Sequence, residues 1–352
     1  MNKPAATFWS GKRVLLTGHT GFKGSWAAVW LSGLGARVTG LALAPDHQPA
    51  LFDAAGIDAL VDSRLVDLRD GAAVHDLVSP SSFDLVLHMA AQPLVRASIN
   101  DPVGAFATNI MGTAHLLQAL RGRDGLQAVL VVTSDKVYLN HEQGRAFAEA
   151  DPLGGKDPYS ASKAAAEIVT RSFAQSYFDR VGTPVATARA GNVIGGGDLS
   201  HDRLVPDLVR AARAQEPALL RHPEATRPWQ HVLDCVAGYL VYMERLANDP
   251  SAPRALNFGP RPGGPEVTVG ELATRVTQAL GACPWRHEPD PTSLEAGSLG
   301  IDAGLAKDTL GFESRLDAPT AVDWTVDWYR AEANGADALA LMRDQISSYE
   351  DL

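Results

Sequence analysis

The stretch K-R-V-L-L-T-G-H-T-G-F-K-G, residues 12–24, decides the fold. Its apolar beginning, residues 12–17, predicts a buried strand, and residues 25–34 behind it have the apolar spacing of a helix. Three glycines between the two follow a G-x-x-G-x-x-G pattern: Gly18, Gly21 and Gly24. A strand, a glycine turn and a helix predict a dinucleotide site, because glycine lets the backbone approach a pyrophosphate and a helix N-terminus offers free N–H groups. A glycine-rich turn without a ligand is the alternative.

The alternation of strands and helices continues as far as residue 190. Further strands are predicted at residues 37–44, 65–68, 83–88, 126–133 and 185–190, with one more at 256–258. Strands that alternate with helices build a parallel sheet with helices on both faces. Beyond residue 190 this rhythm is lost, and residues 198–229 are richer in Arg, His and Pro. We therefore expect an α/β body followed by a smaller region of different architecture.

Composition narrows the class of protein. The chain has 352 residues, of which 45% are hydrophobic and 20% charged, as in a globular protein with a large core. A net charge of −10 argues against nucleic acid or an anionic membrane as partner. The two cysteines, Cys235 and Cys283, lack metal-type spacing, so we expect neither a disulfide framework nor a metal site. The first residues lack the apolar region of a signal peptide, and no apolar run has membrane-spanning length, so we expect a cytoplasmic protein.

The sequence D-P-Y-S-A-S-K, residues 157–163, carries the main catalytic candidates. Tyr159 and Lys163 are four residues apart just inside a predicted helix, so their side chains share one helical face. Because an ammonium beside a phenol favours the phenolate, we expect Lys163 to lower the pKa of Tyr159. A phenol with a lowered pKa could take a proton from an alcohol near neutral pH. The pattern Y-x-x-x-K is weak by itself and depends on the cofactor loop upstream.

Three polar residues follow the strand predicted at 126–133: Ser134, Asp135 and Lys136. In an open α/β sheet the chemistry gathers at the carboxyl ends of the strands. A hydroxyl, a carboxylate and an amine in succession there indicate a site, although a solvated turn would explain any one of them. For Lys136 the alternative to catalysis is a phosphate or carboxylate partner, because lysine acts as a base only where burial or a like charge lowers its pKa.

Residues at the other predicted strand ends favour NAD as the cofactor. The second strand does not end in an acidic residue, Asp46 follows it, and no arginine is placed to receive a 2′-phosphate. Asp67 is placed to meet the adenine, and the small Ala90 and Ala91 would let the cofactor pass close to the backbone. Asn109 lies off the apolar stripe of its helix and is either a solvated polar residue or a bridge to the strand end.

These motifs resemble those of the extended short-chain dehydrogenase/reductase superfamily and, within it, the CDP-glucose 4,6-dehydratases. The matching segments include T-G-H-T-G-F-K-G-S-W, H-M-A-A-Q-P-L-V-R, T-S-D-K-V-Y, D-P-Y-S-A-S-K, A-R-A-G-N-V-I-G-G-G-D and R-P-W-Q-H-V-L. The resemblance implies a Rossmann-type doubly wound parallel sheet, formed by residues 1–190 and about 230–260, that binds NAD. It also implies a smaller C-terminal α+β substrate lobe, formed by residues 191–229 and 261–352, that binds a nucleotide sugar.

The resemblance further implies a role for each site residue. Tyr159 takes the proton of the sugar C4 hydroxyl, Lys163 lowers its pKa and holds the nicotinamide ribose, and Ser134 hydrogen-bonds the C4 oxygen. Asp135 protonates the departing C6 hydroxyl, and Lys136 removes the C5 proton. The cofactor-binding residues that it implies are Gly18, Gly21, Phe22, Lys23, Gly24, Asp67, Leu68, Ala90, Ala91, Asn109, Thr133, Tyr159 and Lys163. The substrate-binding residues that it implies are Gln92, Asn192, Arg203, Leu204, Arg227 and Asn257.

We therefore expect an NAD-dependent nucleotide-sugar 4,6-dehydratase, a hydro-lyase of deoxysugar biosynthesis that converts CDP-glucose to CDP-4-keto-6-deoxyglucose. The chain departs from the family after Lys136 and at residues 294–302, so a dehydratase for another nucleotide sugar stays open, as does a 4-epimerase. A more remote alternative is a non-catalytic NAD-binding regulator. Two helices with wide apolar faces, residues 103–120 and 160–178, either pack on the sheet or pair with their copies, and the resemblance favours a homodimer.

Overall fold

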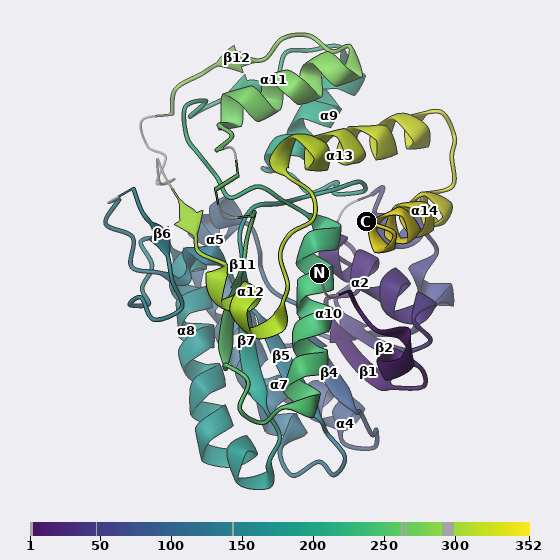
Figure 1. Ribbon diagram of the computed structural model, residues 1–352, viewed down its shortest axis with the longest axis vertical. Coiled ribbons are helices and arrows are strands. Elements are labelled where there is room, and N and C mark those ends of the chain that lie inside the picture. Colours follow the sequence, from purple (N-terminus) through teal and green to yellow (C-terminus); the bar gives the residue numbers. More distant parts are fainter. Residues whose placement is uncertain (1–2, 47, 143, 262, 265, 291–298) are drawn as a thin grey trace.

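A seven-stranded parallel sheet forms the centre of the protein (Figure 1). The computed structural model describes residues 3–46, 48–142, 144–261, 263–264, 266–290 and 299–352. The strands stand in the order β11-β7-β5-β4-β1-β2-β3. Their bounds are Arg13–Thr17 for β1, Arg37–Ala42 for β2, Asp62–Leu65 for β3, Leu85–His88 for β4, Ala128–Val132 for β5, Val185–Ala190 for β7 and Ala255–Phe258 for β11. The chain leaves β1 first towards β2 and then crosses to β4, so a topological switch point lies beside β1.

Helices cover both faces of this sheet. On one face α2 (Phe22–Gly33) packs against α10 (Val232–Asn248) and α14 (Ala338–Glu350). On the other face α4 (Gly71–Val78), α7 (Gly112–Leu120) and α8 (Pro158–Phe173) pack together. Side chains of β1 alternate between the two layers, with Val14 and Leu16 in one apolar core and Leu15 in the other. The expected doubly wound α/β fold is confirmed.

The helix predicted at residues 103–120 is continuous but changes its winding. It consists of α6 (Pro102–Phe106), a π-helical segment (Ala107–Met111) and α7. Insertion of one residue per turn shifts the face of the helix, and π-helical turns are frequent at functional sites. Here the π-helical segment carries Asn109, whose side chain is buried.

A smaller lobe stands over the carboxyl ends of the strands (Figure 1). Its helices are α9 (Leu204–Ala214), α11 (Val269–Leu280) and α13 (Ala318–Ala333). Pairs of short parallel strands lie outside the central sheet: β8 (Val193–Ile194) with β10 (Gln230–His231), β9 (Leu219–Leu220) with β12 (Arg286–His287), and β6 (Ala146–Phe147) with β13 (Gly300–Ile301). The remaining short helices are α1 (Ala6–Trp9), α3 (Leu51–Ala54), α5 (Val95–Asn100) and α12 (Gly304–Leu310).

Two details differ from the sequence prediction. The third strand is Asp62–Leu65 rather than residues 65–68, because an edge strand that faces solvent needs no apolar run. Within the C-terminal segment assigned to the lobe, α12 packs on β11 and α14 packs on α2, so these two helices lie on the Rossmann-type body. None of the helices in the described ranges has the length and apolar character needed to cross a membrane.

Candidate active site

The glycine turn leaves no room for a side chain at Gly18 or at Gly24. Gly18 has a φ of +79°, and a Cβ there would lie 2.8 Å from the backbone nitrogen of Ala90. A Cβ on Gly24 would lie 1.9 Å from the carbonyl oxygen of Gly18. Helix α2 begins at Phe22, and its N-cap, Gly21, offers no side chain to accept from the first N–H groups. These free donors and the positive end of the helix dipole fit the pyrophosphate of a dinucleotide.

The adenine side of the predicted cofactor site lies further along the sheet edge. Leu68 is buried next to Gly112, where a Cβ would come within 2.9 Å of it. Asp67 follows β3 and forms an ion pair with Arg69, with 2.6 Å between Oδ2 and Nη2. Asn109 connects its helix to the segment after β4 and to α8, which agrees with the bridge that was one of the two predictions for it. Its Oδ1 accepts from the backbone nitrogen of Gln92 at 2.8 Å, and its Nδ2 donates to Ser162 Oγ at 2.8 Å.

The catalytic candidates on α8 lie at the start of the helix. Asp157 caps it by accepting from the backbone nitrogen of Ser160 at 3.0 Å, and Pro158 occupies its first turn. Tyr159 and Lys163 are both buried and both line one cavity of about 780 Å³, a volume typical of ligand sites.

The expected effect of Lys163 on the phenol is wrong for the protein alone. Lys163 Nζ donates to the carbonyl oxygen of Val132 at 3.1 Å. Burial and, to a smaller extent, the positive charge of Lys23 together lower the pKa of Lys163 to about 7. Burial raises the pKa of Tyr159, which a hydrogen bond with Ser134 partly offsets. The cause of the error is burial, which opposes charge on both groups and cannot be read from their spacing.

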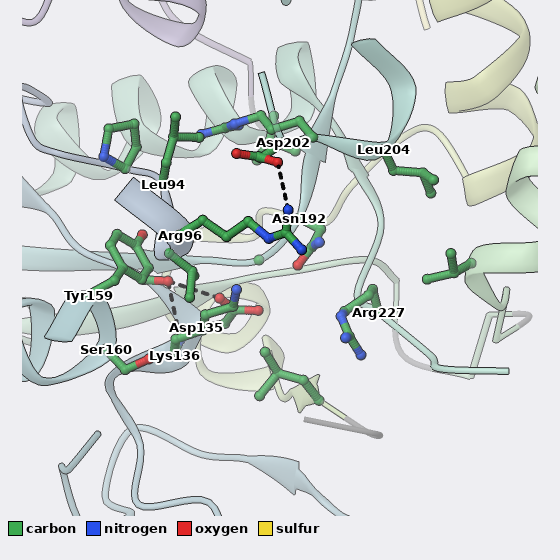
Figure 2. Close-up of a pocket in the computed structure, with 18 of the residues that line it drawn as sticks. Leu94, Arg96, Asp135, Lys136, Tyr159, Ser160, Asn192, Asp202, Leu204 and Arg227 are labelled. Carbon is green, nitrogen blue, oxygen red and sulfur yellow. Dashed lines mark hydrogen bonds and ion pairs between the residues drawn. The ribbon is translucent and has the colours of Figure 1, made fainter. Parts of the chain in front are cut away.

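Ser134, Asp135 and Lys136 reach the same cavity from the end of β5. Ser134 Oγ donates to Asp135 Oδ1 at 3.0 Å, while Asp135 Oδ2 has no hydrogen-bond partner among the described residues. Burial raises the pKa of Asp135, and the nearby Lys136 partly offsets this. Lys136 Nζ lies 5.9 Å from the ring centroid of Tyr159. Figure 2 shows Asp135, Lys136 and Tyr159 close together at one end of the cavity.

The lobe supplies the other wall of the cavity. Four of the predicted substrate-binding residues line it: Asn192, Arg203, Leu204 and Arg227. In Figure 2 Arg227 and Leu204 lie at the end away from Tyr159, with Asn192 between. A cavity with an acid–base group at one end and arginines at the other suits a substrate that carries phosphate, since the guanidinium fork matches phosphate oxygens.

Two predicted substrate residues lie outside the cavity. Asn257 is completely buried, with Nδ2 donating to the carbonyl oxygens of Phe147 and Asp302, both at 2.9 Å. Its Oδ1 accepts from the Tyr138 hydroxyl at 2.6 Å, so no polar atom of this side chain is left to face a ligand. Gln92 Oε1 accepts from the backbone nitrogen of Leu94 and shapes the loop after β4. The structure therefore corrects Asn257 to a structural position, and substrate binding by Gln92 stays a prediction.

Arg96 also lines the cavity, although the sequence did not single it out (Figure 2). Its Nη1 lies 3.5 Å from Asp202 Oδ1 and its Nη2 lies 3.3 Å from Asp290 Oδ2, both in the lobe. The available signal was the position of this cation in Q-P-L-V-R, directly after the M-A-A segment. Of the divergent stretch at residues 294–302, the part up to residue 298 lies outside the described residues.

The sequence matches the model of the NAD dependent epimerase/dehydratase family over residues 14–259. The chain belongs to this family, which confirms the resemblance and the NAD dependence inferred from the motifs. It is 38% identical to a CDP-glucose 4,6-dehydratase from Salmonella typhimurium over 97% of both chains. Two solved structures are similar in fold. An epimerase from Methanothermobacter thermautotrophicus has a TM-score of 0.80 at 21% identity, covering 96% of both chains. A UDP-glucose-4-epimerase from Stenotrophomonas maltophila with bound NAD has a TM-score of 0.79 at 25% identity, covering 92% of this chain and 100% of that one.

Proposed function

We propose that this protein is an NAD-dependent CDP-glucose 4,6-dehydratase, a hydro-lyase that forms CDP-4-keto-6-deoxyglucose. The observation that carries the proposal is the meeting of two functional pairs in one cavity: Tyr159 with Lys163, and Asp135 with Lys136. The first pair suits oxidation of an alcohol, and the second suits removal of water. The likeness to the Salmonella enzyme supports cytosine as the base and glucose as the sugar.

Oxidation at C4 depends on the phenol of Tyr159. NAD held by the glycine turn would supply the hydride acceptor for the oxidation at C4 and the hydride donor for the later reduction at C6. Tyr159 takes the proton of the C4 hydroxyl, and Ser134, which already bonds the phenol, orients the C4 oxygen. Lys163, whose Nζ donates to the carbonyl oxygen of Val132 at the end of β5, would bind the nicotinamide ribose. A positive charge on Lys163 would favour the phenolate that forms during proton transfer, and it would act against the burial that raises the pKa of Tyr159.

Removal of water follows because a ketone at C4 makes the C5 hydrogen acidic. Lys136 takes the C5 proton, and Asp135 gives a proton to the departing C6 hydroxyl, which leaves as water. The raised pKa of Asp135 favours the protonated form that this step requires. C5 is later reprotonated from Lys136, which exchanges its protons with solvent. The product therefore carries a solvent hydrogen at C5.

A 4-epimerase is the second candidate, because structural neighbours include epimerases. An epimerase needs the tyrosine, the lysine and the serine, and leaves Asp135 and Lys136 without a task. A non-catalytic NAD-binding regulator is less well supported, since it would need neither Tyr159 nor Lys163. A dehydratase for a dTDP- or UDP-sugar would use the same residues and differ at the lobe end of the cavity.

The test is a comparison of nucleotide sugars. The protein is incubated with NAD and with CDP-glucose, dTDP-glucose or UDP-glucose, and the products are identified by mass spectrometry and NMR. We expect loss of one water from CDP-glucose and slower or no reaction with the other two. Loss of water from dTDP- or UDP-glucose alone would move the proposal to that nucleotide, and a C4 epimer without loss of water would replace it with an epimerase.

We also propose that the protein is a homodimer. Apolar side chains stand exposed on adjacent helices of one face: Val103 at 75%, Met111 at 49% and Ile168 at 52% of full exposure. The opposite sides of these helices are buried on the sheet. The helix pair therefore has two apolar faces, of which the sheet covers one and the other is exposed. A second copy of this chain would cover the other face in a four-helix interface. Light scattering tests this, and a monomer at micromolar concentration would refute it. A cytoplasmic location stays a prediction.

A further inference from the structure

A buried ion pair that the reaction scheme does not use lies behind the catalytic residues. Arg189 of β7 and Glu167 of α8 are only 5% and 4% exposed. Arg189 Nη2 donates to Glu167 Oε2 at 2.8 Å, and Nε donates to Oε1 at 2.9 Å. Such a pair is retained only where hydrogen bonds compensate the loss of hydration. Here the hydroxyls of Thr133 and Thr187 donate to the same carboxylate, at 2.5 and 2.8 Å.

The carboxylate end of the pair belongs to the helix that carries Tyr159 and Lys163. Glu167 follows Lys163 by four residues, so all three lie on one face of α8. Its partner Thr133 directly precedes Ser134 at the end of β5. The carboxylate therefore joins this helix to the strand end at which the acid–base residues begin.

The guanidinium end reaches the other functional pair. Arg189 Nη1 donates to the hydroxyl oxygen of Tyr138 at 2.9 Å and to the carbonyl oxygen of Glu149 at 3.1 Å. Tyr138 comes directly after the 3₁₀ turn Asp135–Val137. Its ring stacks on Phe147 with centroids 4.9 Å apart, so the tyrosine itself is held on two sides. Arg189 thus contacts the segment that orients Asp135 and Lys136.

We propose that the Glu167–Arg189 ion pair is a positioning element that keeps the turn carrying Asp135 and Lys136 in register with the helix carrying Tyr159 and Lys163. Tyr138 is its contact with that turn. The inference rests on the proposed function, in which one bound sugar meets the first pair at C4 and the second pair at C5 and C6 without leaving the cavity. Two groups that act in turn on adjacent carbons must hold their separation closely, because a displacement of about 1 Å can slow a step roughly a hundredfold.

Two matched variants separate positioning from general stability. Y138F and T187V each remove one hydroxyl that bonds the ion pair and keep the shape of the side chain. Y138F also removes the donor to Asn257 Oδ1, so its thermal unfolding is compared with that of T187V. Tyr138 connects the guanidinium end of the pair to the residue after the turn, whereas Thr187 bonds Glu167 from within β7. Arg189 keeps its two bonds to the Glu167 carboxylate in Y138F, so its charge stays partnered and the protein is expected to fold.

Each half of the reaction is measured by itself. CDP-6-deoxyglucose has no C6 hydroxyl to lose, so formation of its 4-keto form in a single turnover reports on the oxidation by Tyr159, Lys163 and Ser134 without the removal of water. Exchange of the C5 hydrogen of CDP-4-keto-6-deoxyglucose in D2O reports on Lys136 alone. NAD affinity and the midpoint of thermal unfolding are measured for every variant.

We expect Y138F to slow C5 exchange about tenfold, the effect of losing one hydrogen bond to a charged group, with C4 oxidation and NAD affinity as in the wild type. T187V should unfold at a lower temperature and keep the wild-type ratio of the two rates. An unchanged ratio in Y138F, or the same shift in T187V, would overturn the proposal. A wild-type protein that catalyses neither half reaction would instead refute the proposed function.

Discussion

Replacing Gly24 by alanine tests the cofactor site where the geometry is most restrictive. An added Cβ would lie 1.9 Å from the carbonyl oxygen of Gly18 and 2.7 Å from its carbonyl carbon, whereas ordinary contacts begin at 3.4 Å. Both obstacles are backbone atoms, so no side chain can rotate away. The turn and the start of α2 must move apart by roughly 1.5 Å to relieve the overlap.

That movement has two effects. Overpacking of this kind destabilises the fold by about 1–3 kcal/mol. It also displaces the first N–H groups of α2, which are the donors for the pyrophosphate, and each hydrogen bond to a charged group contributes about 1.5–3 kcal/mol. Losing one or two of them weakens NAD binding by about a hundredfold, or close to 3 kcal/mol.

The assay is a calorimetric titration of the purified variant with NAD, together with thermal unfolding. Gly33 in the same helix is the matched control, because a Cβ there meets no atom within 4 Å. G33A should bind NAD as the wild type does and gain up to about 1 kcal/mol of stability, since alanine is the better helix former. Wild-type NAD affinity in G24A would contradict the assignment of residues 18–24 as the pyrophosphate site.

Three further predictions concern the acid–base pair, pH and assembly. K136A should lose exchange of the C5 hydrogen in D2O, followed by NMR, and should still bind NAD, because the amine lines the sugar end of the cavity. Burial lowers the pKa of both His88 and His231 to about 3, from 6.5. Below pH 6.5 the unfolded chain therefore binds more protons than the folded protein. As the pH is lowered, the free energy of unfolding should fall by up to about 1.4 kcal/mol per histidine for each pH unit, and urea unfolding measures this. Unchanged stability between pH 7 and 5 would contradict this. I168D should shift the mass measured by light scattering from dimer to monomer without loss of fold, and a dimeric I168D would contradict the four-helix interface.

The parts of the site that follow from local sequence were predictable. Glycine spacing, a proline before Tyr159 and polar residues after a buried strand each report on backbone geometry within a few residues. Because parallel strands end at one edge of the sheet, the separate motifs around Gly18, Ser134 and Tyr159 could be placed together without coordinates. The structure brings Lys23, Ser134 and Tyr159 to one cavity.

What could not be predicted depends on packing between distant segments. Asn257 has the expected residue type, yet its amide joins β11 to residues 147 and 302 and faces no cavity. The pKa of Tyr159 depends on burial, which the spacing to Lys163 does not encode. Arg96 matters because loops of the lobe, about 100 and 200 residues later in the chain, bring carboxylates to it. The Glu167–Arg189 pair was likewise hidden, because it forms only where α8 packs on β7, which the sequence around each residue does not indicate.

The fate of the hydrogen at C5 tests the central claim most directly. The protein is given CDP-glucose and NAD in D2O, and the product is examined by NMR. The account predicts a sugar that has lost water, carries a ketone at C4 and a methyl group at C6, and holds one deuterium at C5. A product that keeps its C6 hydroxyl and contains no deuterium would show that Asp135 and Lys136 do not act as the acid and base assigned to them.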